Sequence, residues 1–186
     1  KESLAMTQKT LKVKNGKITD SFSTFVDPEQ PLTEEISKLT GITDDMLKGA
    51  PLINEALRNF LDFAGDSVLV AHNAGFDVGF IKQKSKNLGL SAKFTYLDTV
   101  ALARVLLPTL AKYKLNIVAK ALGISLENHH RAVDDAGATA EIFVKFIEML
   151  KERADEANAE KAGLEKSIEE KKSQIKQLTD ENEENK

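Results

Sequence analysis

Hydrophobic and polar residues alternate near the start of the chain, where the pattern predicts a β-hairpin. Two stretches, residues 9–15 and 17–26, place apolar side chains at alternate positions. Asn15-Gly16 lies between them, and this dipeptide is the strongest short signal for a hairpin turn. Pro28 and Pro31 follow, and because proline cannot donate to a β-ladder the hairpin must end before them.

The remainder of the chain mixes short apolar runs with apolar residues at helical spacing. The runs Val68–Ala71 and Phe94–Thr99 predict two short strands. Helices are predicted between Thr33 and Gly41, between Thr43 and Gly49, after Pro51, after Asn73, over Val100–Leu107, over Leu115–Leu122 and from about Ala132. Strands that alternate with helices after a first hairpin indicate an α/β domain with a mixed sheet.

The stretch from Ser67 to Phe80 organises this domain. It reads as a buried strand followed by a helix that Asn73 caps, so Asp77 falls in the first turn of a helix at the carboxyl end of a strand. Ligands of open α/β sheets bind at that end, where a carboxylate among apolar neighbours needs a cationic partner. The alternative is an Asp that only stabilises the helix dipole. The next strand delivers Asp98 to its end in the same way.

The last predicted helix continues beyond the globular part. From Ile147 a heptad frame gives two seam positions that are mostly apolar among Glu and Lys, with lysine at 161 and 171 and a helix-weakening Gly163. We expect residues 1–150 to form the α/β domain and residues 151–186 a charged helical extension, disordered from Asp180. Weak self-association through this helix and a solvated extension without a partner both fit the pattern.

Composition and charge narrow the function classes. The 186 residues contain no cysteine, which excludes disulfides and thiolate metal sites and fits a cytoplasmic protein. No apolar run reaches the length of a membrane span, so no membrane role is expected. Residues 151–186 hold eight basic and eleven acidic side chains, which leaves residues 1–150 neutral. A polyanion would therefore bind through a local patch and bound cations rather than through bulk charge.

All three histidines lie beside the carboxylate-bearing junctions. His72 ends the organising strand, and His129-His130 precede Asp134-Asp135 at the start of the long helix. A histidine near neutral pKa can act as a general base, and paired carboxylates without cysteine favour Mg²⁺ or Mn²⁺. Two such ions would support phosphodiester hydrolysis. The alternative is a helix-entry loop with one packed and one solvated histidine.

Three motifs in order resemble those of the DnaQ-like (DEDDh) 3′–5′ exonucleases. They are Val70-Ala71-His72-Asn73-Ala74-Gly75-Phe76-Asp77, then Leu97-Asp98-Thr99, then His130-Arg131-Ala132-Val133-Asp134-Asp135. Leu39-Thr40-Gly41-Ile42-Thr43 is similar to a further segment of the family. The resemblance spans roughly residues 9–150 and looks closest to the proofreading domain built into the replicative DNA polymerase III of low-GC Gram-positive bacteria. It implies a ribonuclease H-like fold, a five-stranded mixed sheet with helices on both sides.

The resemblance also implies the roles of individual residues. Asp77 and Asp135 match two of the family's four metal-binding acids, and His130 matches the base that deprotonates the attacking water. Asp134 and His129 stand one place away and are expected to be bystanders. Positions that line the terminal nucleotide or brace the site are matched by Leu39, Thr40, Asn73 and Phe76. The implied cofactors are two Mg²⁺ or Mn²⁺ ions, and the implied partners are a single-stranded DNA 3′ end and a DNA polymerase.

One departure from the family pattern is serious. The family's first motif, a strand with Asp-x-Glu followed by Thr-Thr-Gly, should precede the hairpin, but residues 1–8 contain only Glu2 as an acid and lack that turn. Because the sequence starts with Lys1 rather than Met, we expect a piece of a longer protein whose central strand and two metal acids are missing here. The chain alone is then expected to be nearly inactive.

Two other functions fit the same residues. A catalytically silent module of the same fold could bind nucleic acid or a polymerase partner. A member of the family that trims RNA could carry the same motifs, since the residues do not separate DNA from RNA.

Overall fold

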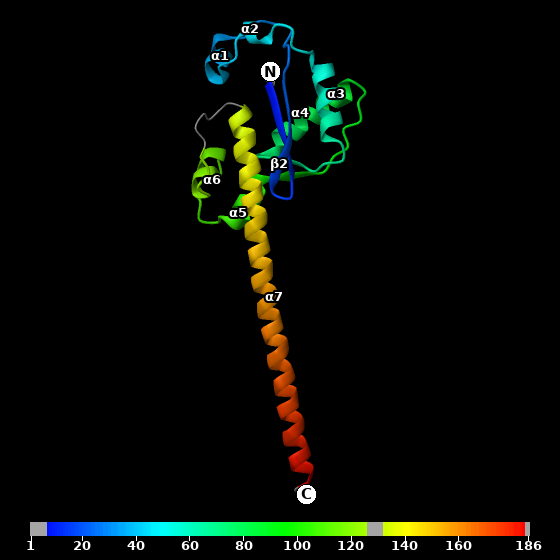
Figure 1. The fold of residues 1–186 in the computed structure, drawn as a ribbon, viewed down its shortest axis with the longest axis vertical. Helices are drawn as coiled ribbons and strands as arrows, with labels where there is room; N and C mark the ends of the chain where they lie inside the picture. The colour runs from blue at the N-terminus through cyan, green and yellow to red at the C-terminus, as the bar shows by residue number, and fades with distance from the viewer. Residues whose placement is uncertain (1–6, 126–131, 185–186) are drawn as a thin grey trace. The chain divides into compact units, whose positions relative to one another are not determined.

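The computed structural model describes residues 7–125 and 132–184, and it divides the chain into two compact units, residues 1–146 and residues 147–186. The first unit holds the strands and the short helices (Figure 1). The strands are β1 (Thr7–Lys14), β2 (Lys17–Phe25), β3 (Leu69–Ala71) and β4 (Tyr96–Asp98). The helices are α1 (Glu34–Thr40), α2 (Asp44–Leu47), α3 (Ile53–Ala64), α4 (Ala74–Asn87), α5 (Thr99–Leu106), α6 (Leu115–Ala121) and α7 (Ala132–Glu184).

The strands form two separate pairs rather than one sheet. β1 and β2 pair antiparallel around Asn15-Gly16, and both residues of this turn have positive φ, as a type I′ hairpin requires. β3 and β4 pair parallel, with Leu69 opposite Tyr96 and Ala71 opposite Asp98. Among residues 7–125 and 132–184, no strand joins the two pairs. The α/β class with flanking helices is therefore confirmed, and so is the expectation of a sheet that is incomplete in its middle.

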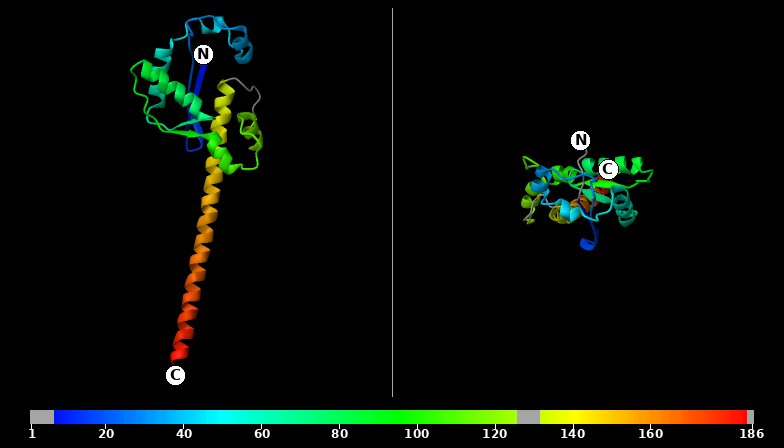
Figure 2. Two further views of the ribbon diagram at one scale, coloured as in Figure 1. Left: turned by 180° about the vertical axis from the view of Figure 1, so that it is seen from behind. Right: turned by 90° about the horizontal axis from the view of Figure 1, so that it is seen from above.

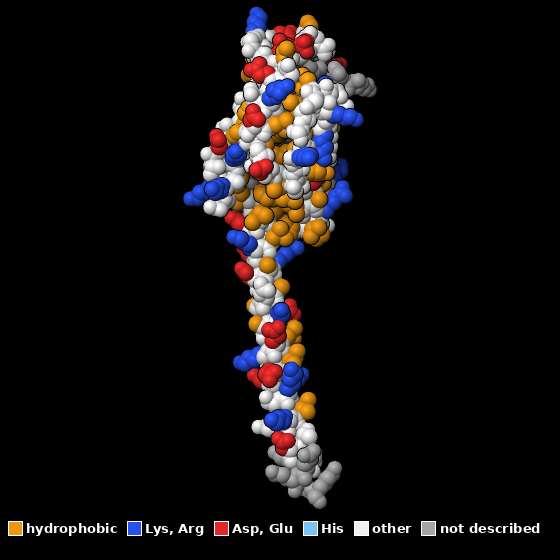
Figure 3. Space-filling model, turned by 90° about the vertical axis from the view of Figure 1, so that its right-hand side faces the viewer, with side chains coloured by type: hydrophobic (Ala, Val, Ile, Leu, Met, Phe, Trp, Pro, Cys, Tyr) orange, Lys and Arg blue, Asp and Glu red, His pale blue; other side chains and the backbone are white. Residues whose placement is uncertain are grey.

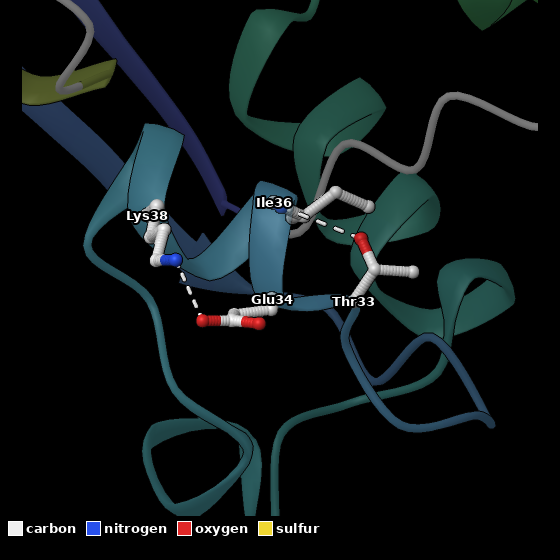
Figure 4. Close-up of polar contacts among 4 residues, drawn as sticks. All are labelled: Thr33, Glu34, Ile36 and Lys38. Carbon is white, nitrogen blue, oxygen red and sulfur yellow. Dashed lines mark hydrogen bonds and ion pairs between the residues drawn. The ribbon is translucent and has the colours of Figure 1, made fainter.

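Helix α1 shows how local sequence sets an element. Thr33 adopts an extended backbone and its Oγ1 accepts a hydrogen bond from the Ile36 backbone N–H at 3.3 Å, while Lys38 and Glu34 form an i,i+4 ion pair of 2.6 Å (Figure 4). Gly41 ends the helix at φ 71°, and its N–H donates to the Ser37 carbonyl. Both predicted ends of this helix are confirmed.

Helices α3 and α4 pack against the strands and supply the buried residues of one hydrophobic cluster. α3 contacts β2, and α4 contacts both β3 and β4 (Figure 2). Leu57, Phe60, Ala64 and Ile81 are buried together, with Phe22 of β2 and Leu69 of β3 packed against them. The two strand pairs thus share one hydrophobic core, although within the described part of the chain no backbone ladder connects them.

Helix α7 belongs to both units. Ala138, Ile142 and Phe146 are buried in the first unit, the latter two completely. From residue 151 to residue 180 every side chain is exposed. The charged sequence predicts disorder from Asp180, but the helix continues to Glu184. Neither glycine nor proline occurs after Gly163, so no residue type that breaks a helix interrupts this end.

Candidate active site

The junction between β3 and α4 places Asp77 in the first turn of a helix, as predicted. Asn73 lies between the two elements in the left-handed conformation, with φ 68° and ψ 50°, which asparagine tolerates better than most residues. Asn73 occupies the predicted N-cap position of α4, but its side chain makes no capping hydrogen bond. The left-handed backbone turns the Asn73 N–H toward Asp98 instead, where it donates to Oδ1 at 3.0 Å.

Asp98 fixes two junctions through one carboxylate oxygen. It ends β4 and caps α5, since its Oδ1 also accepts the Val100 N–H at 2.8 Å. Because β3 and β4 are parallel, their carboxyl ends meet at one edge, and the carboxylate lies where it can reach both following helices. Sequence reasoning identified Asp98 at a strand end but missed this double contact. The Leu97-Asp98-Thr99 motif was the available signal, because Asp before a helix is a capping residue.

His72 is held between α5 and the loop before α6. Its Nε2 lies 2.8 Å from the Tyr113 carbonyl oxygen and its Nδ1 lies 2.8 Å from Thr99 Oγ1. A carbonyl oxygen only accepts, so Nε2 carries the proton and donates to it. In the neutral ring Nδ1 then accepts from the Thr99 hydroxyl. The fully buried Thr99 has a second partner, the Ala71 carbonyl at 3.3 Å, to which it can donate if Nδ1 becomes protonated.

The charge of His72 depends on burial and on two carboxylates. Burial lowers the pKa of His72, while the hydrogen bond to the Tyr113 carbonyl and the negative charges of Asp98 and Asp135 act in the opposite direction. The imidazole is therefore mainly neutral near pH 7. Both ring nitrogens are already engaged, so His72 is a structural clamp here rather than a base open to substrate.

Asp77 combines accessibility with partial dehydration. Neighbouring protein atoms raise the pKa of its carboxyl, the Asp77 backbone N–H lowers it, and the negative charge of Asp98 raises it again. Its side chain nevertheless remains exposed, so the dehydration is incomplete and a ligand can reach it. A cation bound at this carboxylate would relieve the repulsion from Asp98.

Asp135 lies half-buried near the start of α7, where its carbonyl accepts the Thr139 hydroxyl at 2.7 Å. It acts on the charge of His72, as Asp98 does, and Asp98 in turn acts on Asp77. These four side chains therefore belong to one electrostatic neighbourhood. Within the described parts of the chain, however, no three His, Asp or Glu side chains are grouped closely enough to hold a metal ion. The shared metal site of Asp77 and Asp135 stays a prediction.

Of the other predicted site residues, one is exposed beside Asp77, one braces a turn at the end of α1, and the rest lie wholly or partly outside the described residues. Phe76 precedes Asp77 in α4 and its side chain is 65% exposed, so it is free to contact a ligand. Thr40 ends α1, donates to the Ile36 carbonyl at 2.8 Å and accepts the Ile42 N–H at 3.2 Å, which braces this turn. Leu39 lies in α1, but its side chain is outside the described part, as are the Asp134 side chain and the whole of His129 and His130.

The family model described as "Exonuclease" (RNase_T) matches residues 9–143, which include most of both strand pairs and the carboxylates of Asp77, Asp98 and Asp135. The chain belongs to the exonuclease family.

Relatives of this exonuclease chain include PolC-type DNA polymerases III. The protein of Clostridium perfringens is 57% identical over 145 residues, and that of Caldanaerobacter subterraneus is 55% identical over 142. These matches cover 78% and 76% of this chain but only 10% of each relative. The exonuclease chain thus spans about a tenth of the length of the curated relatives it matches.

Solved structures of exonucleases share the fold. Exonuclease X in complex with 5′ overhanging duplex DNA superposes with a TM-score of 0.60 at 25% identity, covering 77% of this chain and 82% of that one. The nuclease domain of 3′hExo, a DEDDh family member bound to rAMP, gives a TM-score of 0.63 at 20% identity, covering 71% and 74%. No helix in the described part of the exonuclease chain is both long and apolar enough to cross a membrane.

Proposed function

We propose that this chain is the 3′–5′ exonuclease domain of a replicative DNA polymerase and hydrolyses phosphodiester bonds at DNA 3′ ends as a proofreading activity. The observation that carries the proposal is the junction of β3 and α4. It presents an accessible carboxylate, Asp77, and an exposed aromatic ring, Phe76, on adjacent residues of one turn. The 57% identity to a PolC-type polymerase supports DNA as the substrate and a polymerase as the partner. A cytoplasmic location belongs to the same proposal.

The donor chemistry at this junction suits a hard divalent cation. The ligands would be the carboxylates of Asp77 and Asp135, since Mg²⁺ and Mn²⁺ prefer oxygen and the chain contains no thiol. Burial and the negative charge of Asp98 raise the pKa of the Asp77 carboxyl, and a bound cation would offset both effects by stabilising the ionised carboxylate. When bound, two such ions lower the pKa of water and stabilise the leaving oxygen.

The protein itself would position the strand end and move the proton. His130 is assigned as the general base that takes a proton from the attacking water, a role that contributes about 10²–10⁴-fold in rate. Phe76 would stack on the terminal base, and stacking on an aromatic ring tolerates any base sequence. Leu39, Thr40 and Asn73 would line the terminal nucleotide.

A silent binding module is the second candidate. It is favoured by the metal-ligand geometry of residues 7–125 and 132–184, where no three His, Asp or Glu side chains lie close enough to hold a metal ion. Two acids alone offset little of the charge of two divalent ions. We therefore expect the 186-residue chain by itself to degrade DNA very slowly.

One assay tests both candidates. End-labelled single-stranded DNA is incubated with Mn²⁺ and either the chain or the chain extended by an upstream strand that carries Asp-x-Glu-Thr-Thr-Gly. We expect activity from the extended chain alone. In it, Asp135→Asn should remove activity and His130→Ala should reduce it by about 10²–10⁴-fold. Asp134→Asn and His129→Ala are the matched controls, one residue away, and should stay active. A parallel RNA substrate measures the preference for DNA.

The outcomes separate the candidates. If the extended chain is inactive yet still binds DNA in a filter assay, the silent module is correct. If Asp134→Asn and Asp135→Asn lose activity equally, the assignment of the metal acid is wrong.

A further inference from the structure

The second unit is a helix with an uncovered hydrophobic seam. Every side chain from residue 151 to residue 180 is exposed, and hydrophobic side chains recur along this helix among charged ones (Figure 3). The large apolar side chains fall on two positions of a heptad and are 39–64% exposed: Ile147, Leu150, Leu164, Ile168, Ile175 and Leu178. A helix in water owes most of its stability to the packing of its apolar face, so a partner that covers this seam would stabilise the helix.

We infer that the partner is a second copy of this chain, and that the two helices pair antiparallel over residues 147–178. This inference is independent of the proposed function. It rests on the placement of charge along the seam and along the helix, in three steps.

The first step concerns the two seam lysines. In a parallel pair in register, Lys161 faces the partner's Lys161 and Lys171 faces the partner's Lys171, which brings like charges together in the seam. In the antiparallel pair with full overlap, Lys161 faces Leu164 of the second copy and Lys171 faces Ala154. The lysine stems then cover apolar side chains while their ammonium groups reach solvent. Lys161 Nζ already lies 3.8 Å from Glu165 on its own helix.

The second step concerns the remaining seam layers. The antiparallel register that pairs Lys161 with Leu164 also pairs Ile147 with Leu178, Leu150 with Ile175, and Ala157 with Ile168 of the second copy. Each layer therefore contains at least one large apolar side chain or one alanine, and no layer joins two lysines. The whole seam is covered in this single register.

The third step concerns the charge of the two halves. Residues 147–160 hold five acidic and two basic side chains, a net charge of −3, whereas residues 165–178 hold four basic and three acidic ones, a net charge of +1. Antiparallel pairing places these opposite halves together, while parallel pairing places the −3 half against itself. The flanking positions do not discriminate, since each orientation creates one like-charge pair: Glu160 with Glu165 in the parallel pair, and Lys151 with Lys172 in the antiparallel one.

The absence of cysteine from the sequence makes orientation directly measurable. Ala157→Cys and Ile168→Cys are prepared separately in the full chain, and Ser173→Cys, on the outer face of the helix, is the control. Under mild oxidation, a mixture of the first two variants should give a disulfide between residue 157 of one copy and residue 168 of the other. Each variant alone should stay monomeric on a non-reducing gel, because a disulfide needs Cα atoms within about 7 Å.

Mass in solution provides the second measurement. Light scattering on the unmodified chain should approach twice the 20.5 kDa of one chain as concentration rises. Ile168→Asp should return it to the mass of one chain, whereas Ser173→Asp should not. Covalent dimers of either single variant alone would establish parallel pairing and overturn the inference. A chain that stays monomeric at all concentrations, or that forms trimers or larger assemblies, would overturn it as well.

Discussion

The burial of His72 makes the stability of the first unit depend on pH. Nε2 donates to the Tyr113 carbonyl, and Nδ1 meets a threonine hydroxyl that can either donate or accept. The ring can therefore keep both contacts in either charge state, provided that the Thr99 hydroxyl turns toward the Ala71 carbonyl. What the fold cannot keep is the hydration of the charged ring, which is why its pKa is lowered.

We predict that this histidine costs stability in mild acid. Because the pKa of His72 is lower in the folded state than in the unfolded state, the unfolded chain binds the proton first. Stability is thus complete above the ordinary pKa of 6.5 and falls as the pH drops from there to the lowered folded value. Urea unfolding followed by tyrosine fluorescence measures this effect, at about 1.4 kcal/mol for each unit of pKa shift. Both tyrosines, Tyr96 and Tyr113, belong to the first unit.

The control for this prediction is His72→Asn, which cannot titrate. The difference in unfolding free energy between the two proteins should shrink as the pH falls through that window, whereas His129 and His130 contribute equally to both. If this difference in unfolding free energy is constant with pH, or grows in acid, then the folded state does not hold His72 in its neutral form.

Sequence reasoning placed Asp77 correctly in the first turn of the helix after β3, because strand-to-helix junctions are encoded locally by an apolar run, an asparagine and helical spacing. It placed Asn73 at the start of the helix, but it did not foresee the missing side-chain cap or the contact between the Tyr113 carbonyl and His72. The left-handed turn of Asn73 is stabilised by Asp98, which lies 25 residues away, and the Tyr113 carbonyl is a backbone group that any residue could supply. The residue types near such a contact do not reveal it, so the sequence alone does not predict it.

Asp98 connects elements as well as residues. One of its oxygens accepts N–H groups at the starts of α4 and α5, so it ties the two helices that follow the parallel strands. This contact orients the turn that carries Asp77. Asp98 is therefore a positioning residue for the proposed site.

Removing this acceptor should destabilise the first unit. Asp98→Ala leaves two N–H groups without their partner, and loss of a helix cap alone costs about 0.5–2 kcal/mol. Asp98→Asn is the matched control because its side-chain oxygen can still accept both hydrogen bonds, and we expect it to lose less than half as much. Equal losses in urea unfolding would mean that the charge of Asp98, and not its acceptor geometry, stabilises the junction.

The positions of most helices and strands were predictable from the sequence, and glycine or asparagine marked several of their ends. Asn15-Gly16, Gly41 and Gly123 mark turns or helix ends through positive φ, which glycine adopts without strain and asparagine at low cost. The pairing of the strands was not encoded in this way. Whether a hairpin and a parallel pair join into one sheet depends on a strand between them, and this was foreseen only through the family resemblance and its missing first motif.

At the level of the whole chain, two kinds of order coexist. The first unit is held by a buried core in which Ile142 and Phe146 of α7 are inaccessible to solvent, whereas the second unit exposes every side chain from 151 to 180. The hydrophobic periodicity of the second unit could be read from the sequence, but the orientation of its pairing follows only when charge is compared between its two halves.

The split between the strand pairs has a further consequence for how the first unit opens. The hairpin is attached by side chains and by its ends: Phe22 packs on Phe60 and Phe63, Lys12 lies over the Phe63 ring, and the Asp27 N–H donates to the Pro51 carbonyl just after β2. No ladder passes from β2 to β3 within the described residues, so the hairpin can detach without breaking a hydrogen bond of β3 or β4. It should behave as a separate cooperative unit of local unfolding.

Native-state hydrogen exchange measures this directly. The amides of β1 and β2 should exchange together, with an opening free energy below that of the amides in α3 and β3, and Phe22→Leu should lower the hairpin value while leaving β3 unchanged. Equal opening energies in both strand pairs would show that they unfold as one body. With different energies, the hairpin is the part of the first unit that can come away and return while the edge bearing Asp77 and Asp98 stays folded.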